Sequence, residues 1–247
     1  INWKQTLMVA CNIAVGIYLV LAVTAFNDPD EAMAKECTEV KIDIEKESME
    51  GFLNPGEVKK LLTQHKLYPL SQPMSTISPR KMEETLQKSP FVEKAECYKT
   101  LSGHVCINLK QRIPVIRIMS DNDDNYYLDN HGNIMPEAGY ATDILIATGH
   151  ISKKYAQNVL SKIANHIVSN TFWKNQKVQL NVLTNGTLEM VPRVGDHIVF
   201  LGSPTHIDSK LERLRKFYIY GLNKAGWNKY SYINVEFNNQ IICKKNN

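Results

Sequence analysis

The chain has 247 residues, of which 43% are hydrophobic and 22% are charged, and its formal net charge is +4. This composition is typical of folded globular protein and excludes a largely disordered chain. The charge is uneven: residues 28–150 carry 14 basic and 20 acidic residues, whereas residues 151–247 carry 14 basic and five acidic ones. Because the basic residues are scattered and lack interleaved aromatics, we expect a solvated face or an acidic protein partner rather than nucleic acid.

Residues 6–26 contain no charged side chain. A helix over the 20 residues from Leu7 to Phe26 is about 30 Å long, which matches the hydrocarbon thickness of a bilayer. A cleaved signal peptide has a shorter apolar region of about 7–15 residues, although the small residues at 22–25 leave cleavage as an alternative. We predict one transmembrane helix over residues 6–26. Lys4 precedes it, so the positive-inside rule places residues 1–5 in the cytoplasm and the remaining chain outside.

The next segment predicts a strand, two helices and two further strands. Residues 40–44 alternate between apolar and polar side chains, as in a half-buried strand. Asn54-Pro55 and Ser78-Pro79 are helix-start signals, and Pro90 ends the second helix. Residues 91–99 and 104–110 are extended runs joined by a short turn. We therefore expect a three-stranded sheet with one face covered by two helices.

The cysteine pattern leaves one disulfide open. The five cysteines contain no CxxC pair, which argues against a zinc or thioredoxin-like site. If Thr100 opposes Gly103 in the turn, Cys97 lies opposite Cys106 with Cβ atoms about 4.5–5.5 Å apart. A disulfide requires about 3.8 Å, so a Cys97–Cys106 bond would be strained, and two free thiols are the alternative.

Beyond Pro114 the sequence alternates between strands and tight turns. Ser152 is a helix cap, Asn185-Gly186 is a strong hairpin signal, and apolar residues between 207 and 222 follow helical spacing. This segment predicts a mainly antiparallel sheet with two helices, so the fold class is α+β. The expected strands are 113–119, 126–129, 133–136, 143–148, 178–183, 187–191, 197–201, 230–237 and 240–244.

The residues that carry chemistry in enzymes are not arranged in recognisable sets. The seven histidines contain no HxH or HExxH pair, and there is no GxSxG, Walker A or GxGxxG motif. Asp121-x-Asp123-x-Asn125 begins like a calcium loop, but Tyr126 replaces the required glycine, so we interpret it as a solvated turn. We expect no enzyme activity, no metal, no cofactor and no small-molecule substrate, which leaves a binding module.

Five stretches carry a resemblance to known families: LQKSPFVEKA at 86–95, INLKQRIPV at 107–115, YLDNHGNIMP at 127–136, GDHIVFLG at 195–202 and YINVEF at 232–237. The first two, with the order of elements before Pro114, the proline-hydrophobic pattern and the Arg-x-Pro exit, resemble a POTRA domain; Gln111 stands where an acidic residue is common. With the later stretches, the whole chain resembles the FtsQ/DivIB family of bacterial cell-division proteins.

The resemblance implies a domain plan and a cellular role. Residues 37–112 would form the POTRA domain and residues 113–245 the FtsQ-type β-domain, both periplasmic or otherwise extracytoplasmic. The protein would be a single-pass type II protein of the inner (cytoplasmic) membrane at the division septum. It would be a divisome scaffold that binds FtsB-like and FtsL-like proteins, links early and late division proteins, and controls septal peptidoglycan synthesis.

The resemblance also indicates where partners bind. A final strand near a chain end can accept a partner's strand at its open edge. Phe237 falls where the family has an edge aromatic, and Asn239 where it has a small polar residue; these two are the main expected contacts, with Glu236 and Lys245 as further ones. The competing interpretation is that Phe237 only packs within the sheet. Glu236 and Lys245 stand where relatives can carry Arg and Trp, so the partner surface should differ there.

Two alternatives remain. POTRA domains also occur in outer-membrane assembly and secretion factors, but such a factor predicts a following barrel of many alternating strands. The residues after Pro114 include two helices and do not fit that pattern. A wall-processing enzyme is the second alternative, which a peptidoglycan hydrolysis assay would detect.

Overall fold

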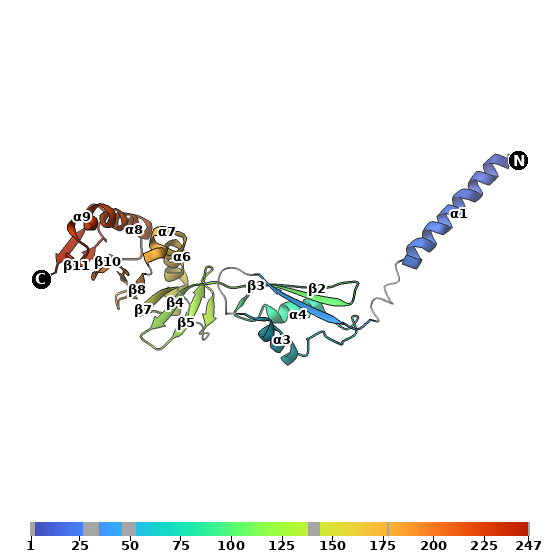
Figure 1. Ribbon diagram of the computed structural model, residues 1–247, viewed down its shortest axis with the longest axis horizontal. Helices are drawn as coiled ribbons and strands as arrows, with labels where there is room; N and C mark the ends of the chain where they lie inside the picture. Colours follow the sequence, from blue (N-terminus) through green and yellow to red (C-terminus); the bar gives the residue numbers. More distant parts are fainter. Residues whose placement is uncertain (1–2, 27–34, 46–52, 138–143, 177, 247) are drawn as a thin grey trace. The chain divides into compact units, whose positions relative to one another are not determined.

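The computed structural model describes residues 3–26, 35–45, 53–137, 144–176 and 178–246 (Figure 1). After the N-terminal helix α1 (Trp3–Phe26), the chain forms two compact units, the first extending to Lys110 and the second beginning at Gln111. Each unit has its own buried core. The architecture is mixed α+β, with a large sheet rich in antiparallel pairs, as the sequence predicted.

Helix α1 is continuous over 24 residues. Within the part of the chain that the structure describes, no helix is identified as long and apolar enough to cross a membrane. The span over residues 6–26 stays a prediction.

The described residues of the first unit after α1 form a three-stranded sheet and two helices. Its strands lie in the order β1-β3-β2, with β1 parallel to β3. Both helices begin where the sequence indicated: Asn54 Oδ1 accepts from Glu57 N at 3.0 Å, and Ser78 Oγ accepts from Lys81 N at 3.4 Å. The elements are β1 (Glu39–Ile44), α3 (Pro55–Gln64), α4 (Pro79–Leu86), β2 (Val92–Lys99) and β3 (His104–Gln111).

The register of the β2–β3 hairpin decides against the Cys97–Cys106 bond that the sequence left open. Thr100 N donates to His104 O at 2.9 Å, so the turn is one residue longer than a pairing of Thr100 with Gly103 requires. A one-residue shift turns a side chain to the other face of a sheet. Cys97 is buried on the helix side, whereas Cys106 lies between the buried Val105 and Ile107 and faces the opposite side. Both thiols are free, and the disulfide is wrong.

The second unit is built on a nine-stranded sheet in the order β12-β11-β10-β9-β8-β7-β4-β5-β6. The pairs β4–β7, β7–β8 and β10–β11 are parallel and the others are antiparallel. The strands are β4 (Pro114–Ser120), β5 (Asn125–Asp129), β6 (Ile134–Pro136), β7 (Leu145–Gly149), β8 (Gln179–Val182), β9 (Leu188–Val191), β10 (Ile198–Gly202), β11 (Tyr230–Asn234) and β12 (Ile242–Lys245).

Two long helical segments pack on this sheet (Figure 1). Ser152 caps the first, as predicted, by accepting from Tyr155 N at 3.2 Å. A third helix, α7 (Thr171–Gln176), was not predicted, because its six residues are too few to show helical spacing; it buries Trp173 against Tyr218. The long segments are α5 (Lys153–Tyr155), η1 (Ala156–Leu160) and α6 (Ser161–Ser169), followed later by α8 (Ile207–Lys216), η2 (Phe217–Leu222) and α9 (Asn223–Ala225), where η marks π-helical turns.

A buried carboxylate joins two stretches that carried the family resemblance. Asp129 is 1% exposed and accepts from Arg112 at 2.7 Å, from the backbone of His131 at 2.9 Å, and from the backbone and side chain of Asn133 at 2.7 and 2.9 Å. Burial by itself raises the pKa of this carboxyl, but the hydrogen bonds outweigh burial and hold the pKa below its ordinary value. The Arg-x-Pro exit and the β5–β6 turn are therefore fixed by one charge.

Replacing Asp129→Asn should lower the free energy of unfolding of the second unit by about 2 kcal/mol near pH 7, because Arg112 loses its charged partner. Since folding lowers the carboxyl pKa, its stabilisation is present above the unfolded pKa of about 3.9 and is lost as the pH falls through the folded pKa. Urea denaturation followed by tryptophan fluorescence measures both effects. The control Asp121→Asn changes an exposed carboxylate; equal losses in both variants would contradict the prediction.

The two thiols of the β2–β3 hairpin should differ in reactivity. Burial, and then the nearby charge of Glu83, raise the pKa of Cys97 to about 12, so roughly one Cys97 thiol in ten thousand is ionised at pH 8. Cys106 is half-exposed and should be alkylated first by iodoacetamide in the folded, unreduced protein. Peptide mass spectrometry measures both rates, with the unfolded protein as control. A peptide pair linked through Cys97 and Cys106 would refute the corrected register.

Candidate partner-binding site

The last two strands end the large sheet and present its open edge. β12 pairs antiparallel with β11, and no other strand of the described chain pairs with it. Both strands are shorter than predicted: β11 ends at Asn234, and β12 begins only at Ile242. Phe237 therefore lies in the turn between the strands rather than at the end of a strand, which corrects its expected place on the edge strand.

Three of the four residues expected to contact a partner share this turn. Phe237 is 46% exposed and Asn239 is exposed, whereas Glu236 is half-buried. Lys245 lies at the other end of β12, opposite Tyr230, and is exposed. The structure thus brings Glu236, Phe237 and Asn239 together and separates Lys245 from them by the length of a strand.

The carboxylate of Glu236 is engaged within the unit. Glu236 Oε1 accepts from Ser203 N at 3.3 Å, directly after β10. Gly202 has a φ of +68°, and a Cβ added there would lie 2.4 Å from Glu236 Cδ. A glycine is required because its left-handed backbone leaves the space that the carboxylate occupies. Glu236 therefore fixes the position of the turn next to β10.

A buried lysine lies on the other side of this contact. Lys210 of α8 is 3% exposed, and its Nζ donates to Ser203 O at 2.7 Å and to Ser203 Oγ at 3.3 Å. Burial lowers the pKa of Lys210, while the charge of Glu236 opposes that shift. The two opposite charges compensate each other at the ends of β10 and β11, which reduces the cost of burying the lysine.

Arg213, one turn further along α8, holds the backbone of the same turn. Its guanidinium donates to Val235 O at 2.5 Å and to Asn238 O at 3.2 Å. These carbonyls lie on either side of Phe237, so the arginine fixes the segment from which the exposed phenylalanine projects. The planar guanidinium can reach two carbonyls at once, which the single ammonium group of lysine does less well. Sequence reasoning missed this role, because an arginine on an amphipathic helix usually points to solvent.

The surface beside the edge is basic and apolar. Lys244 and Lys245 on β12 are exposed, as is Ile242, at 49%. Tyr232 pairs with Lys244 and stacks on Phe200 of β10, with ring centroids 6.2 Å apart. Exposed lysines along an open edge favour an acidic partner strand.

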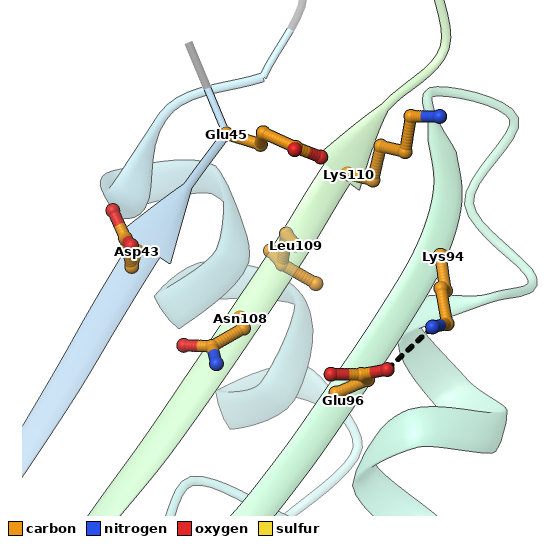
Figure 2. A pocket seen from close by; sticks show the side chains of 7 residues that line it. All are labelled: Asp43, Glu45, Lys94, Glu96, Asn108, Leu109 and Lys110. Carbon is orange, nitrogen blue, oxygen red and sulfur yellow. Dashed lines mark ion pairs between the residues drawn. The ribbon is translucent and has the colours of Figure 1, made fainter.

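Metal chemistry finds no support in the described residues, among which no group of three His, Cys, Asp or Glu side chains could hold an ion. The calcium-like loop is used differently: Asp121 faces His150 at 3.1 Å, and Asp124 faces Lys153 at 3.6 Å. An open hollow of about 490 Å³ lies on the face of the first unit's sheet that the helices leave free (Figure 2). Its lining alternates in charge, and Lys94 pairs with Glu96 across it at 2.5 Å.

The fold defines a class of protein in which a small strand-helix-helix-strand-strand unit precedes a large mixed sheet that has an open edge. A family model described as FtsQ/DivIB, C-terminal related, matches residues 113–244, more than half of the chain, and a model of the POTRA-like domain matches residues 35–110. The chain belongs to the FtsQ/DivIB family of cell-division proteins. No curated protein matches the sequence.

Membership sets the general role. The FtsQ/DivIB family consists of non-catalytic scaffold proteins that associate with the membrane at the division site and have other division proteins as partners.

Replacing Arg213→Ala should loosen the turn around Phe237, because two carbonyls lose a charged donor. We expect amide hydrogen exchange of residues 236–241 to rise about tenfold or more, and Arg213→Lys to give an intermediate value. The control Lys216→Ala removes an exposed cation from the same helix. Unchanged exchange in the Arg213→Ala variant, measured by mass spectrometry of the peptides, would disprove the role of the arginine.

Proposed function

We propose that the chain is a non-enzymatic, membrane-anchored divisome scaffold. It binds FtsB-like and FtsL-like proteins outside the cytoplasm, links early and late division proteins, and controls septal peptidoglycan synthesis. The observation that carries the proposal is the outer edge of strand β12, which no other described strand pairs with and which lies within the region that the FtsQ/DivIB model matches.

Binding at this edge follows from the backbone. The outer N–H and C=O groups of an edge strand pair with an extended segment of another protein, which supplies affinity without a deep pocket. Neighbouring side chains then select the partner. Lys244 and Lys245 favour acidic residues, and Ile242 offers an apolar contact. An acidic strand with an apolar residue is the partner that this edge fits best.

The turn next to β12 supplies an anchor outside the strand. Phe237 exposes 46% of its surface although it is a large apolar side chain, and Arg213 and Glu236 fix the backbone on both sides of it. An aromatic side chain that is held in place loses little entropy on binding, which is typical of interface hot spots. In this proposal Phe237 inserts into an apolar pocket of the partner and Asn239 makes a polar contact.

In this proposal the segment over residues 6–26 anchors the protein in the membrane. Its support is an uncharged sequence of membrane-spanning length and its position within the continuous helix α1. Residues 1–5 then lie in the cytoplasm, and residues 37–112 and 113–245 form the POTRA and β-domains on the outer side of the inner membrane. The family's association with the membrane supports this topology.

Replacing Phe237→Ala should weaken binding of the FtsB-like partner by roughly 2–4 kcal/mol, because the anchor is lost. Titration of the purified partner into the full chain in detergent measures the affinity. The control Tyr220→Ala removes a more exposed aromatic, 69%, from helix η2, away from the turn. Equal affinities for the wild type and Phe237→Ala would exclude this anchor.

Depletion tests the cellular role itself. Cells that lose the protein should form filaments without septa, and the wild-type copy should restore division. Normal septation after depletion would reject the scaffold function, and hydrolysis of peptidoglycan by the purified chain would reject its non-enzymatic character.

A further inference from the structure

The first unit also has an open edge, on β1. β1 is the outermost strand in the order β1-β3-β2, and no strand of the described residues pairs with its outer side (Figure 2). Glu45 N donates to Leu109 O at 2.9 Å, so alternate residues before Glu45 direct their backbone groups toward β3. The residues between them, Val40, Ile42 and Ile44, therefore direct their N–H and C=O groups outward.

The opposite edge of the same sheet is closed. The outward N–H of Cys97 on β2 donates to the carboxylate of Glu83 on α4 at 2.7 Å. Lys99 Nζ, also on β2, donates to Met74 O at 2.5 Å. A helix that covers an edge and caps its amides prevents another strand from pairing there. Strand addition to this sheet is therefore directed to β1.

β1 carries charged side chains, which usually help to protect an edge, but it lacks the bulge and the proline that also do so. Its pairing with β3 runs without a bulge from Glu39 to Ile44, and it contains no proline. Val40, Ile42 and Ile44 pack on the core from the helix side but remain half-exposed. Another strand beside β1 would cover these three apolar side chains.

The charges on the other face of β1 are self-complementary. When two copies of β1 pair antiparallel about Ile42, Lys41 of each copy lies opposite Asp43 of the other. On the helix side Ile42 meets Ile42, and Val40 meets Ile44. This register pairs all three outward residues. Moving it two residues one way puts Lys41 opposite Lys41, and two residues the other way puts Asp43 opposite Asp43.

The ends of this arrangement carry like charges, because Glu39 lies opposite Glu45. Glu39 already has cationic neighbours: Lys41 at 3.8 Å and the ring of His104 at 3.5 Å. Glu39 and Glu45 are exposed at the strand ends, where water and salt screen repulsion strongly. The central Lys41–Asp43 pairs, which repeat on both sides of the two-fold axis, are closer together and less solvated.

We propose that β1 binds β1 of a second copy of this chain, in an antiparallel pair centred on Ile42, and joins the two small sheets into one. The interface is isologous, since the same residues contribute from both copies. It does not involve β12, so it does not depend on the partner proposed above.

A charge-swap series tests the pairing. Lys41→Asp alone, or Asp43→Lys alone, puts like charges opposite each other and should raise the dimer dissociation constant at least tenfold. The double variant with both changes restores opposite charges and should recover dimerisation. Sedimentation of the full chain in detergent over a range of concentrations measures the dimer dissociation constants of the wild type, the two single variants and the double variant. The control Lys94→Asp changes an exposed charge on the same face, on β2, and should leave the dimer unchanged.

A backbone variant tests the edge independently. Ile42→Pro removes one outward N–H and keeps the bonds to β3, so the fold should persist while the dimer weakens; circular dichroism checks the fold. The chain being monomeric at every concentration would overturn the proposal. So would a dimer that resists both single swaps, or protection of the β1 amides from exchange only when a different protein is added. Phe237→Ala should leave dimerisation unchanged, which separates this test from that of the scaffold.

Discussion

Strands at the margin of an open sheet carry N–H and C=O groups that no neighbouring strand satisfies, and this constraint shapes both units of the chain. On β2 an outward N–H group is satisfied within the same unit, since Glu83 on α4 accepts from Cys97 N. On β12 it is left open, next to a turn that exposes Phe237. A scaffold that binds other proteins by strand addition needs an available edge for each partner and protection of the others, because every unprotected edge also invites unwanted pairing.

The terminal turn shows how a flexible connection becomes a defined binding surface. Lys210 and Arg213 project from one face of α8, and Glu236 returns from the turn toward Ser203. Each charged group makes a hydrogen bond to a backbone atom of the turn or of the residue that follows β10. The exposed phenylalanine therefore stands on a backbone fixed by tertiary contacts, although the turn itself has no regular structure.

Local signals predicted the elements well. Asn54 and Ser78 cap α3 and α4, and Ser152 caps the first long helix of the second unit, because an N-cap depends only on a side chain and the amides three residues later. Register was less predictable. The sequence left the Cys97–Cys106 disulfide open, and the structure decides against it because a turn longer by one residue reverses the face of every side chain beyond it. The predicted position of Phe237 on an edge strand was wrong, because β11 ends at Asn234 and leaves Phe237 in the following turn.

The sequence by itself predicted most of the elements in order, the α+β class and the family resemblance that the family models confirm, while the domain bounds at residues 112 and 113 stay a prediction. These follow from spacing along the chain, which is local. Only the tertiary structure decided which strand edges are open, which carboxylates are buried, and that Arg213 reaches the turn 22 residues later. Those properties depend on which distant segments become neighbours. Strands that are far apart in the sequence pair in a sheet, and the hydrophobic periodicity of each strand does not show which other strand it pairs with.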